Sequence, residues 1–182
     1  GQVFAASLDG RLTLRSTTDG ELVSAVESPG GPIRALAATP DGRWLLAARS
    51  DRRLGLLDPA TLQTLHGLRG HEGALSHVAA VGRDLAVTLA TDRRLRFWSL
   101  DPPGELGVQV LGAVELSALA VHADTARVLV GDGAGRLHVL DLGRPGRRRE
   151  LRADPSRRRS KAGADRAERL AACGRDWLFQ GL

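Results

Sequence analysis

Cysteine, aromatic residues and long apolar runs are scarce in this 182-residue chain, and each scarcity excludes a class of protein. The single cysteine, Cys173, excludes an internal disulfide and a cysteine-based metal cluster. It fits a reducing, intracellular location, cytoplasmic or nuclear. No apolar run approaches the ~18 residues that a helical membrane span needs, so we expect no membrane partner. Aromatic residues make up 3% of the chain and none lies among the arginines of residues 147–161, which disfavours stacking on nucleic-acid bases.

Catalytic and cofactor motifs are missing as well. The histidines have no metal-ligand spacing such as His-x-x-x-His, and there is no nucleophile elbow or catalytic pair of carboxylates. The glycine-rich run over residues 131–135 lies between two predicted strands, so we interpret it as a tight turn. A phosphate loop would instead open a helix. We therefore expect a protein that is not an enzyme and has no catalytic residues, cofactor or metal.

One short apolar pattern recurs four times at a nearly constant interval. Its copies place their first leucine at Leu12, Leu54, Leu95 and Leu137, which are 41 or 42 residues apart. A period of about 40–45 residues built from short strands is typical of β-propeller blades, each a four-stranded sheet. We predict an all-β fold, a β-propeller fragment of about four four-stranded antiparallel blades.

Each unit can be divided into four short strands separated by turns of Asp, Gly and Pro. In the third unit we expect strands over residues 75–81, 85–90, 94–100 and 106–111, with a tight turn at 91–93. In the second unit the outer strand is expected over residues 62–65. This order favours an antiparallel meander.

The period also sets the expected boundaries along residues 1–182. They are a partial blade over 1–32, blades over 33–74, 75–115 and 116–153, a basic loop insertion over 154–165, and the start of a next blade over 166–182. The chain begins and ends inside a unit, so we expect it to be a partial ring from a longer protein.

The third unit resembles a known repeat. Gly70-His71 precedes its first strand, Asp92 lies in its tight turn and Trp98 lies in its third strand. With these residues the unit resembles the WD40 repeat family. The resemblance implies a WD40-like β-propeller with a structural hydrogen-bond network of His71, Thr88, Asp92 and Trp98, in which His71 has no metal-binding or catalytic role.

The other units keep less of the WD40 pattern. The second unit keeps Asp51 but has Leu57 in the Trp position and Gly30-Gly31 in place of Gly-His. The fourth unit has Ala134 where the turn Asp is expected. The resemblance therefore covers most of the chain in its period and is specific in one unit.

The resemblance also implies a partner-binding face, formed by the loops that enter the first strand and the turns between the second and third strands. The residues carried over to this face are Arg34, Arg52, Ser76, Arg93, Glu115 and Ser117. Three are arginines, whose guanidinium groups bind carboxylates and phosphates with paired hydrogen bonds. The expected partner is a protein or peptide, acidic or phosphorylated, and the alternative is a solvated charged rim.

A basic segment accounts for the net charge of +5. Residues 1–140 have a net charge of −1 and residues 141–182 a net charge of +6. Arg157, Arg158, Arg159 and Lys161 lie in the predicted insertion, which we interpret as a solvated loop, with contact to acidic protein or nucleic acid as an alternative. Ser160 follows three arginines, as in substrates of basophilic kinases, so a phosphosite is the third interpretation.

Together these features predict a non-enzymatic protein-protein interaction scaffold that binds its partner through the loop face. The alternative is a sensor or autoinhibitory WD40 region of a larger multidomain signalling NTPase, which a P-loop elsewhere in the parent protein would favour. A catalytic propeller would need His, Asp or Glu on its innermost strands, which here are mostly Ala, Leu and Val.

Overall fold

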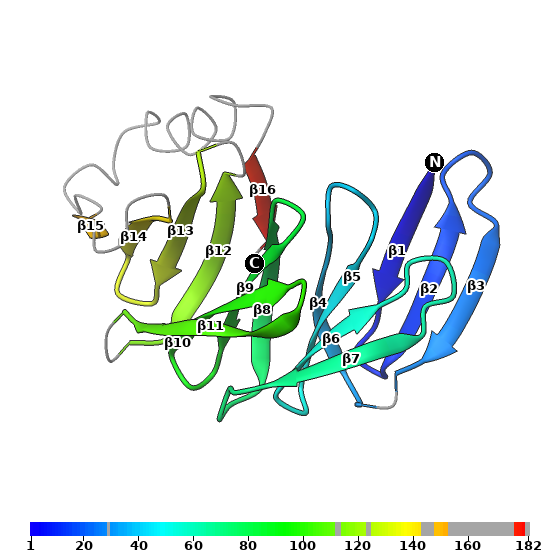
Figure 1. The fold of residues 1–182 in the computed structure, drawn as a ribbon, viewed down its shortest axis with the longest axis horizontal. Helices are drawn as coiled ribbons and strands as arrows, with labels where there is room; N and C mark the ends of the chain where they lie inside the picture. The colour runs from blue at the N-terminus through cyan, green and yellow to red at the C-terminus, as the bar shows by residue number, and fades with distance from the viewer. Residues whose placement is uncertain (29, 112–113, 123–124, 143–147, 153–176, 181–182) are drawn as a thin grey trace.

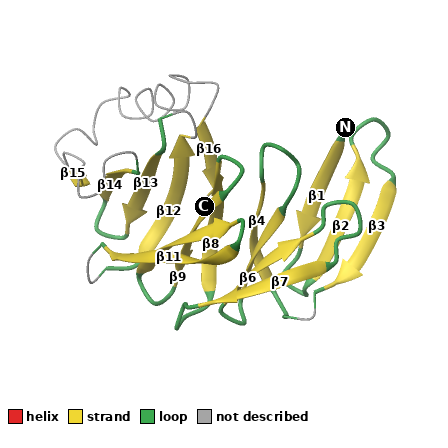
Figure 2. Cartoon of the chain, viewed as in Figure 1, coloured by secondary structure: helices red, strands yellow, loops and turns green. Residues whose placement is uncertain are grey.

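The computed structural model describes residues 1–28, 30–111, 114–122, 125–142, 148–152 and 177–180. Within these residues every regular element is a β-strand, and the strands form four antiparallel sheets that stand side by side (Figure 1). Within the first three sheets, short loops join consecutive strands (Figure 2). The predicted all-β fold of antiparallel blades is confirmed, and the described part contains no helix that could cross a membrane.

The strands of each sheet follow one another in the chain. The first sheet contains β1 (Gln2–Ala6), β2 (Arg11–Ser16) and β3 (Leu22–Glu27). The second contains β4 (Ile33–Ala38), β5 (Leu45–Arg49), β6 (Arg53–Leu57) and β7 (Thr64–Arg69). The third contains β8 (Leu75–Val81), β9 (Leu85–Ala90), β10 (Arg94–Leu100) and β11 (Pro103–Val110). The fourth contains β12 (Leu116–His122), β13 (Arg127–Asp132), β14 (Arg136–Asp141) and β15 (Arg148–Arg152), with β16 (Trp177–Gln180) beside β12.

The first strand of each four-strand unit is the innermost one. β4 lies against β8 and β8 lies against β12, whereas β7, β11 and β15 form the outer edges of their sheets. This is the arrangement of propeller blades around a common centre. The turns between second and third strands therefore share one end of the blades.

Three sequence expectations differ from the structure. The outer strand of the second sheet is β7, not residues 62–65, because Asp58 Oδ1 caps the N–H groups of Ala60 and Thr61 and holds a turn there. β11 begins at Pro103 rather than at residue 106. Of residues 166–182, expected to start a next blade, the four described as β16 pair with β12 and so extend the fourth sheet.

The core consists of three apolar layers between successive sheets. Along β5, Leu45 and Ala47 pack toward the first sheet, whereas Leu46 and Ala48 pack toward the third. A further layer, which includes Leu95, lies between the third and fourth sheets. Alternate side chains of a strand point to opposite faces of its sheet. A strand whose sheet lies between two other sheets is therefore apolar on both faces. This explains why residues 45–48 of β5 are all apolar.

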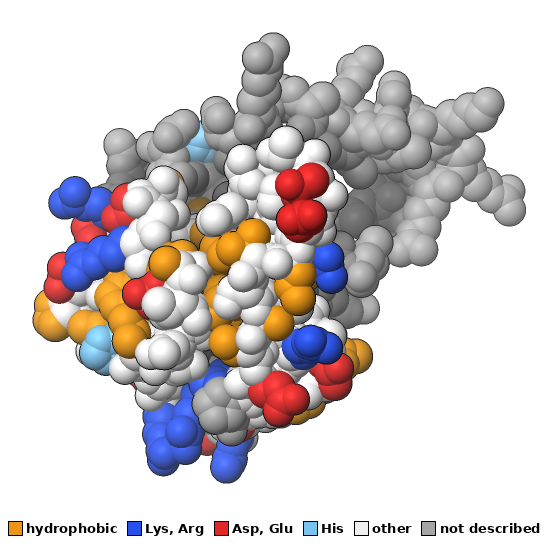
Figure 3. All heavy atoms as spheres, turned by 90° about the vertical axis from the view of Figure 1, so that its right-hand side faces the viewer, with side chains coloured by type: hydrophobic (Ala, Val, Ile, Leu, Met, Phe, Trp, Pro, Cys, Tyr) orange, Lys and Arg blue, Asp and Glu red, His pale blue; other side chains and the backbone are white. Residues whose placement is uncertain are grey.

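The first sheet has one face without a covering sheet in the described chain. Leu12 and Leu14 pack toward the second sheet, so Val3 and Ala5, at positions of the other parity, belong to the opposite face. Val3 is 48% exposed. Figure 3 shows apolar side chains at the centre of this end of the molecule with charged side chains around them.

Candidate functional site

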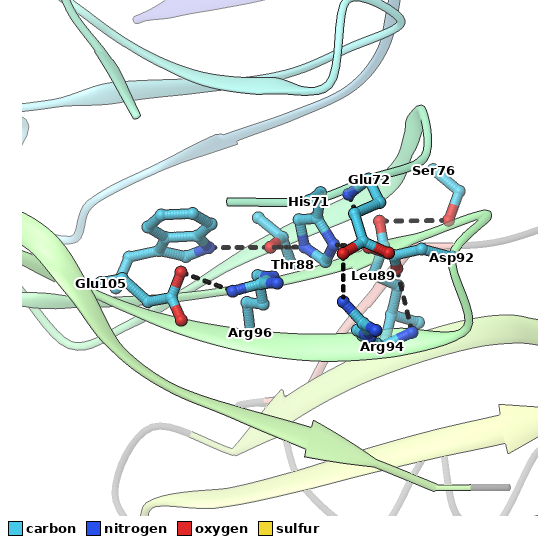
Figure 4. A network of polar contacts seen from close by, with 10 residues as sticks. His71, Glu72, Ser76, Thr88, Leu89, Asp92, Arg94, Arg96 and Glu105 are labelled. Atoms are coloured by element: carbon cyan, nitrogen blue, oxygen red, sulfur yellow. Dashed lines mark hydrogen bonds and ion pairs between the residues drawn. The ribbon is translucent and has the colours of Figure 1, made fainter. Parts of the chain in front are cut away.

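A buried polar network crosses the third sheet and joins four side chains (Figure 4). Thr88 Oγ1 lies 2.7 Å from His71 Nε2 and 2.8 Å from Trp98 Nε1. Asp92 Oδ2 lies 2.9 Å from His71 Nδ1. The structure thus brings together all four residues of the expected network, with Thr88 and Trp98 almost fully buried.

One arrangement of protons satisfies every member of this network. A carboxylate only accepts hydrogen bonds, so the neutral His71 ring carries its hydrogen on Nδ1 and donates it to Asp92. His71 Nε2 then accepts from the Thr88 hydroxyl, whose oxygen accepts from the Trp98 N–H. Burial lowers the pKa of His71, and the bond to Asp92 offsets this only in part, so the ring is neutral at pH 7.

Asp92 connects the buried network to the loop face. Its Oδ1 accepts from the backbone N–H of Arg94 and its Oδ2 from that of Glu72, each at 3.0 Å. Burial raises the pKa of Asp92, but the hydrogen bonds from His71 and the Glu72 N–H outweigh burial, so the pKa lies below its ordinary value. Asp92 therefore stays ionised and fixes the turn in which Arg93 lies.

An ion pair beside the network was not predicted from the sequence. Arg96 on β10 is 7% exposed, and its Nη1 donates to Glu105 Oε2 on β11 at 2.5 Å. A Cβ on Gly70 would lie 2.5 Å from the same oxygen, so this glycine leaves room for the pair. The pairing depends on a β-bulge in β11 that shifts the register, and a bulge has no clear signal in the sequence.

The second sheet has different side chains at its loop end. Arg49, the last residue of β5, is 4% exposed, and its Nε and Nη2 donate to Ser28 Oγ at 3.0 and 2.6 Å. Burial lowers the pKa of Arg49, and Asp51 offsets this in part. A Cβ on Gly30 would lie 2.6 Å from both Arg49 Nε and Asp51 Oδ2. Gly30, the glycine that this unit keeps from the Gly-His pair, thus makes room for Arg49.

The fourth sheet replaces the missing turn carboxylate with Asp132, two residues before Ala134. Asp132 Oδ1 accepts from the N–H groups of Ala134 and Arg136 at 3.0 and 2.9 Å. Its Oδ2 accepts from Arg136 Nε at 2.7 Å and lies 3.0 Å from His138 Nε2. Burial alone would raise the pKa of Asp132, but these hydrogen bonds hold it far below its ordinary value. Asp132, an acidic residue inside the glycine-rich run, was the signal that the sequence analysis missed.

Three of the predicted partner-binding residues occupy one equivalent position. Arg34, Ser76 and Ser117 are the extra residues of β-bulges near the start of β4, β8 and β12. The two serines donate to carbonyls of their second strands at 3.3 and 3.4 Å, and Arg34 Nε donates to Ser50 Oγ at 3.2 Å. These side chains therefore bend over the second strand at the loop end. Glu115 is exposed just before β12.

Arg52 and Arg93 occupy the equivalent turns of the second and third sheets. Both are exposed, and both adopt the left-handed conformation, with φ of 71° and 62°. The same position holds Gly10 in the first sheet and Gly135 in the fourth, with φ of 89° and 76°. The left-handed conformation costs a residue other than glycine roughly 1–2 kcal/mol. Two arginines are thus displayed in turns that glycine would form without strain.

The basic loop and its phosphosite, Arg157, Arg158, Arg159, Ser160 and Lys161, lie outside the described residues. In the part of the chain that is described, no three or more His, Cys, Asp or Glu side chains gather to hold a metal ion.

The chain is similar to parts of several longer proteins. No protein-family model matches the chain. Autophagy-related protein 16 of Arabidopsis thaliana is 26% identical over 144 residues, which are 78% of this chain and 28% of that protein. WD repeat-containing protein 81 of Homo sapiens is 37% identical over 68 residues, which are 37% of this chain and 4% of that protein. The chain therefore spans well under two thirds of these relatives.

Solved structures match the fold over most of the chain. The WD40 repeats of RRP9 align with a TM-score of 0.74 at 14% identity, covering 84% of this chain and 48% of that one. The structure of U3-55K aligns with a TM-score of 0.73 at 16% identity. The repeat period, the blade-like sheets and these likenesses agree, so the chain forms part of a WD40-like β-propeller and is similar to WD repeat proteins.

Proposed function

We propose that this chain is a non-enzymatic protein-interaction scaffold whose loop face binds an acidic or phosphorylated segment of a partner protein. One observation carries the proposal: Arg52 and Arg93 adopt a left-handed conformation at exposed turns. Glycine forms the same turn in two other sheets of this chain, so the fold does not require arginine there. Strain that is kept at an exposed position indicates a function for the side chain.

The charges around these turns support an anionic partner. Arg34 adds a third cation, and its Nε reaches Ser50, two residues before Arg52. The turn carboxylate Asp51 accepts from the Arg53 N–H at 3.2 Å. The carboxylate of Asp92 is used in the same way, so the turn acids are occupied by their own backbone. Guanidinium groups at such a face bind carboxylate and phosphate oxygens through charge-assisted hydrogen bonds.

The remaining predictions belong to the same proposal. Ser76, Ser117 and Glu115 would contribute polar contacts at the edge of the arginine cluster, and the location is intracellular. Contact of the basic loop with nucleic acid, and phosphorylation of Ser160, stay predictions.

Fluorescence anisotropy tests the proposal with a labelled peptide of glutamates around one phosphoserine, and with a matched peptide of glutamines around serine. We expect the anionic peptide alone to bind, and Arg52→Gly or Arg93→Gly to weaken its binding. Arg83→Gly is the matched control, because Arg83 is an exposed arginine between β8 and β9, at the other end of the third sheet. Equal binding of both peptides, or equal loss in all three variants, would overturn the proposal.

A further inference from the structure

We propose a second docking site at the outer edge of the third sheet, where an uncharged extended segment of a partner protein adds a strand beside β11. β11 has 8 residues, more than any other described strand. It pairs with β10 alone among the described strands, so the backbone groups of its other edge have no strand partner (Figure 1). This edge belongs to the outermost strand of the blade and includes none of the arginines proposed for the loop face.

Three aliphatic side chains are exposed at alternate positions of β11. Leu106 is 63%, Val108 49% and Val110 58% exposed. Val108 lies opposite Arg96 and Val110 opposite Arg94 in the strand register, so both valines lie on the same face of the sheet. An added strand could pack apolar side chains against these two valines while its backbone pairs with β11.

The other outer strands carry a charge where β11 has Val110. The residues at this register are Glu27 on β3, Arg69 on β7 and Arg152 on β15, each opposite the first arginine of its third strand. At the register of Val108 those strands have Ala25, Gly67 and Glu150. A charge on an edge strand prevents unwanted strand pairing. Among the described outer strands, β11 alone has no charge at the register of Val110, and it has a β-branched residue at both positions.

The two arginines opposite the valines are already paired with carboxylates of this chain. This pairing determines which kind of partner segment the edge favours. Arg96 is paired with Glu105 at 2.5 Å, and Arg94 with Glu72 at 3.1 Å. The edge therefore offers no net charge to attract an acidic or basic segment. An uncharged segment rich in β-branched residues fits it best.

The size of the edge favours a partner segment over a second copy of this chain. Stable protein interfaces bury ~1,200–2,000 Å² in total, and one pair of strands of this length covers much less. Strand addition to a sheet edge by a short peptide works at this size, because main-chain hydrogen bonds supply the affinity and side-chain pockets the specificity.

The experiment uses the 182-residue chain and a capped peptide of alternating valine and threonine, as long as β11. Binding is measured by anisotropy, and the site by hydrogen exchange of amides 103–110. Val110→Lys should abolish binding, whereas the matched control Val110→Thr, which keeps the β-branch, should retain it. Val108→Glu copies the charge that β15 has at this register and gives a second variant if Val110→Lys lowers the unfolding temperature. A peptide methylated on alternate backbone nitrogens should not bind.

Slowed exchange at 103–110 in the wild-type chain, lost with Val110→Lys, is the expected result. Equal binding of the methylated peptide, equal binding to Val110→Lys, or unchanged exchange at 103–110 would each overturn the proposal. Sedimentation measures whether the wild-type chain is a dimer. If it is, and if Val110→Lys dissociates the dimer but the peptide fails to do so, the edge binds a second copy of this chain and the proposal is overturned.

Discussion

Replacing Thr88 by valine tests whether the buried network stabilises the third blade. Valine has nearly the shape of threonine but no hydroxyl, and Thr88 has 0% exposed surface. The substitution therefore removes the atom that accepts from Trp98 Nε1 at 2.8 Å and lies 2.7 Å from His71 Nε2. Water cannot replace it without opening the core.

The expected loss follows from the two groups left without partners. Each of these two buried groups costs about 1–3 kcal/mol without a hydrogen-bond partner, so Thr88→Val should lower the free energy of unfolding by roughly 2–6 kcal/mol. Thr88→Ser is the matched control, because it keeps the hydroxyl and removes one buried methyl group. It should cost about 1 kcal/mol.

Urea unfolding followed by tryptophan fluorescence and by circular dichroism measures both variants against the wild-type chain. The network account requires Thr88→Val to be clearly less stable than Thr88→Ser. If the valine variant were as stable as the serine variant or more so, the hydroxyl would not stabilise the fold, and the reasoning from hydrogen-bond satisfaction would be refuted.

Three further predictions concern pH, the loop face and the fourth sheet. Burial holds the pKa values of His71 and His77 below 6.5 in the folded chain. At a pH between these folded pKa values and 6.5, the unfolded chain therefore binds more protons than the folded chain. Stability should therefore be full above 6.5 and fall as the pH drops toward the folded values, and a melting temperature that does not change over this range would contradict this. Arg52→Gly and Arg93→Gly should each raise the free energy of unfolding by roughly 0.5–1 kcal/mol, since relief of strain exceeds the entropy cost of glycine; lower stability in urea would count against a strained turn. Asp132→Ala should cost roughly 1.5–3 kcal/mol, because it removes the carboxylate that accepts from the Ala134 and Arg136 N–H groups, whereas Asp84→Ala, which breaks an exposed pair with Arg83, should change little; equal losses in urea unfolding would disprove the special role of Asp132.

The repeat period was enough to predict the blades, because each blade is a local meander whose strands and turns follow a fixed order. The spacing of Leu12, Leu54, Leu95 and Leu137 reflects one equivalent buried strand, and the first three of these side chains are fully buried. The motif of the third unit led to His71, Thr88, Asp92 and Trp98, which lie in contact, because a motif of this kind specifies both residue type and place.

The variant networks could not be predicted, because they depend on three-dimensional space rather than on a motif. Arg49 fills a position that Gly30 leaves open, and this relation appears only when the loop and β5 are seen together. Asp132 reaches the same backbone turn from two residues earlier, so a search at Ala134 finds nothing. The bulges that hold Arg34 and Ser76 likewise depend on strand register.

Hydrogen exchange of the chain with and without the phosphoserine–glutamate peptide tests the central claim, that the loop face binds an anionic segment. The account predicts slowed exchange at residues 50–53 and 91–94, the turns that display Arg52 and Arg93. Slowing confined to residues 39–44 and 82–84, at the opposite end of the blades, would contradict it.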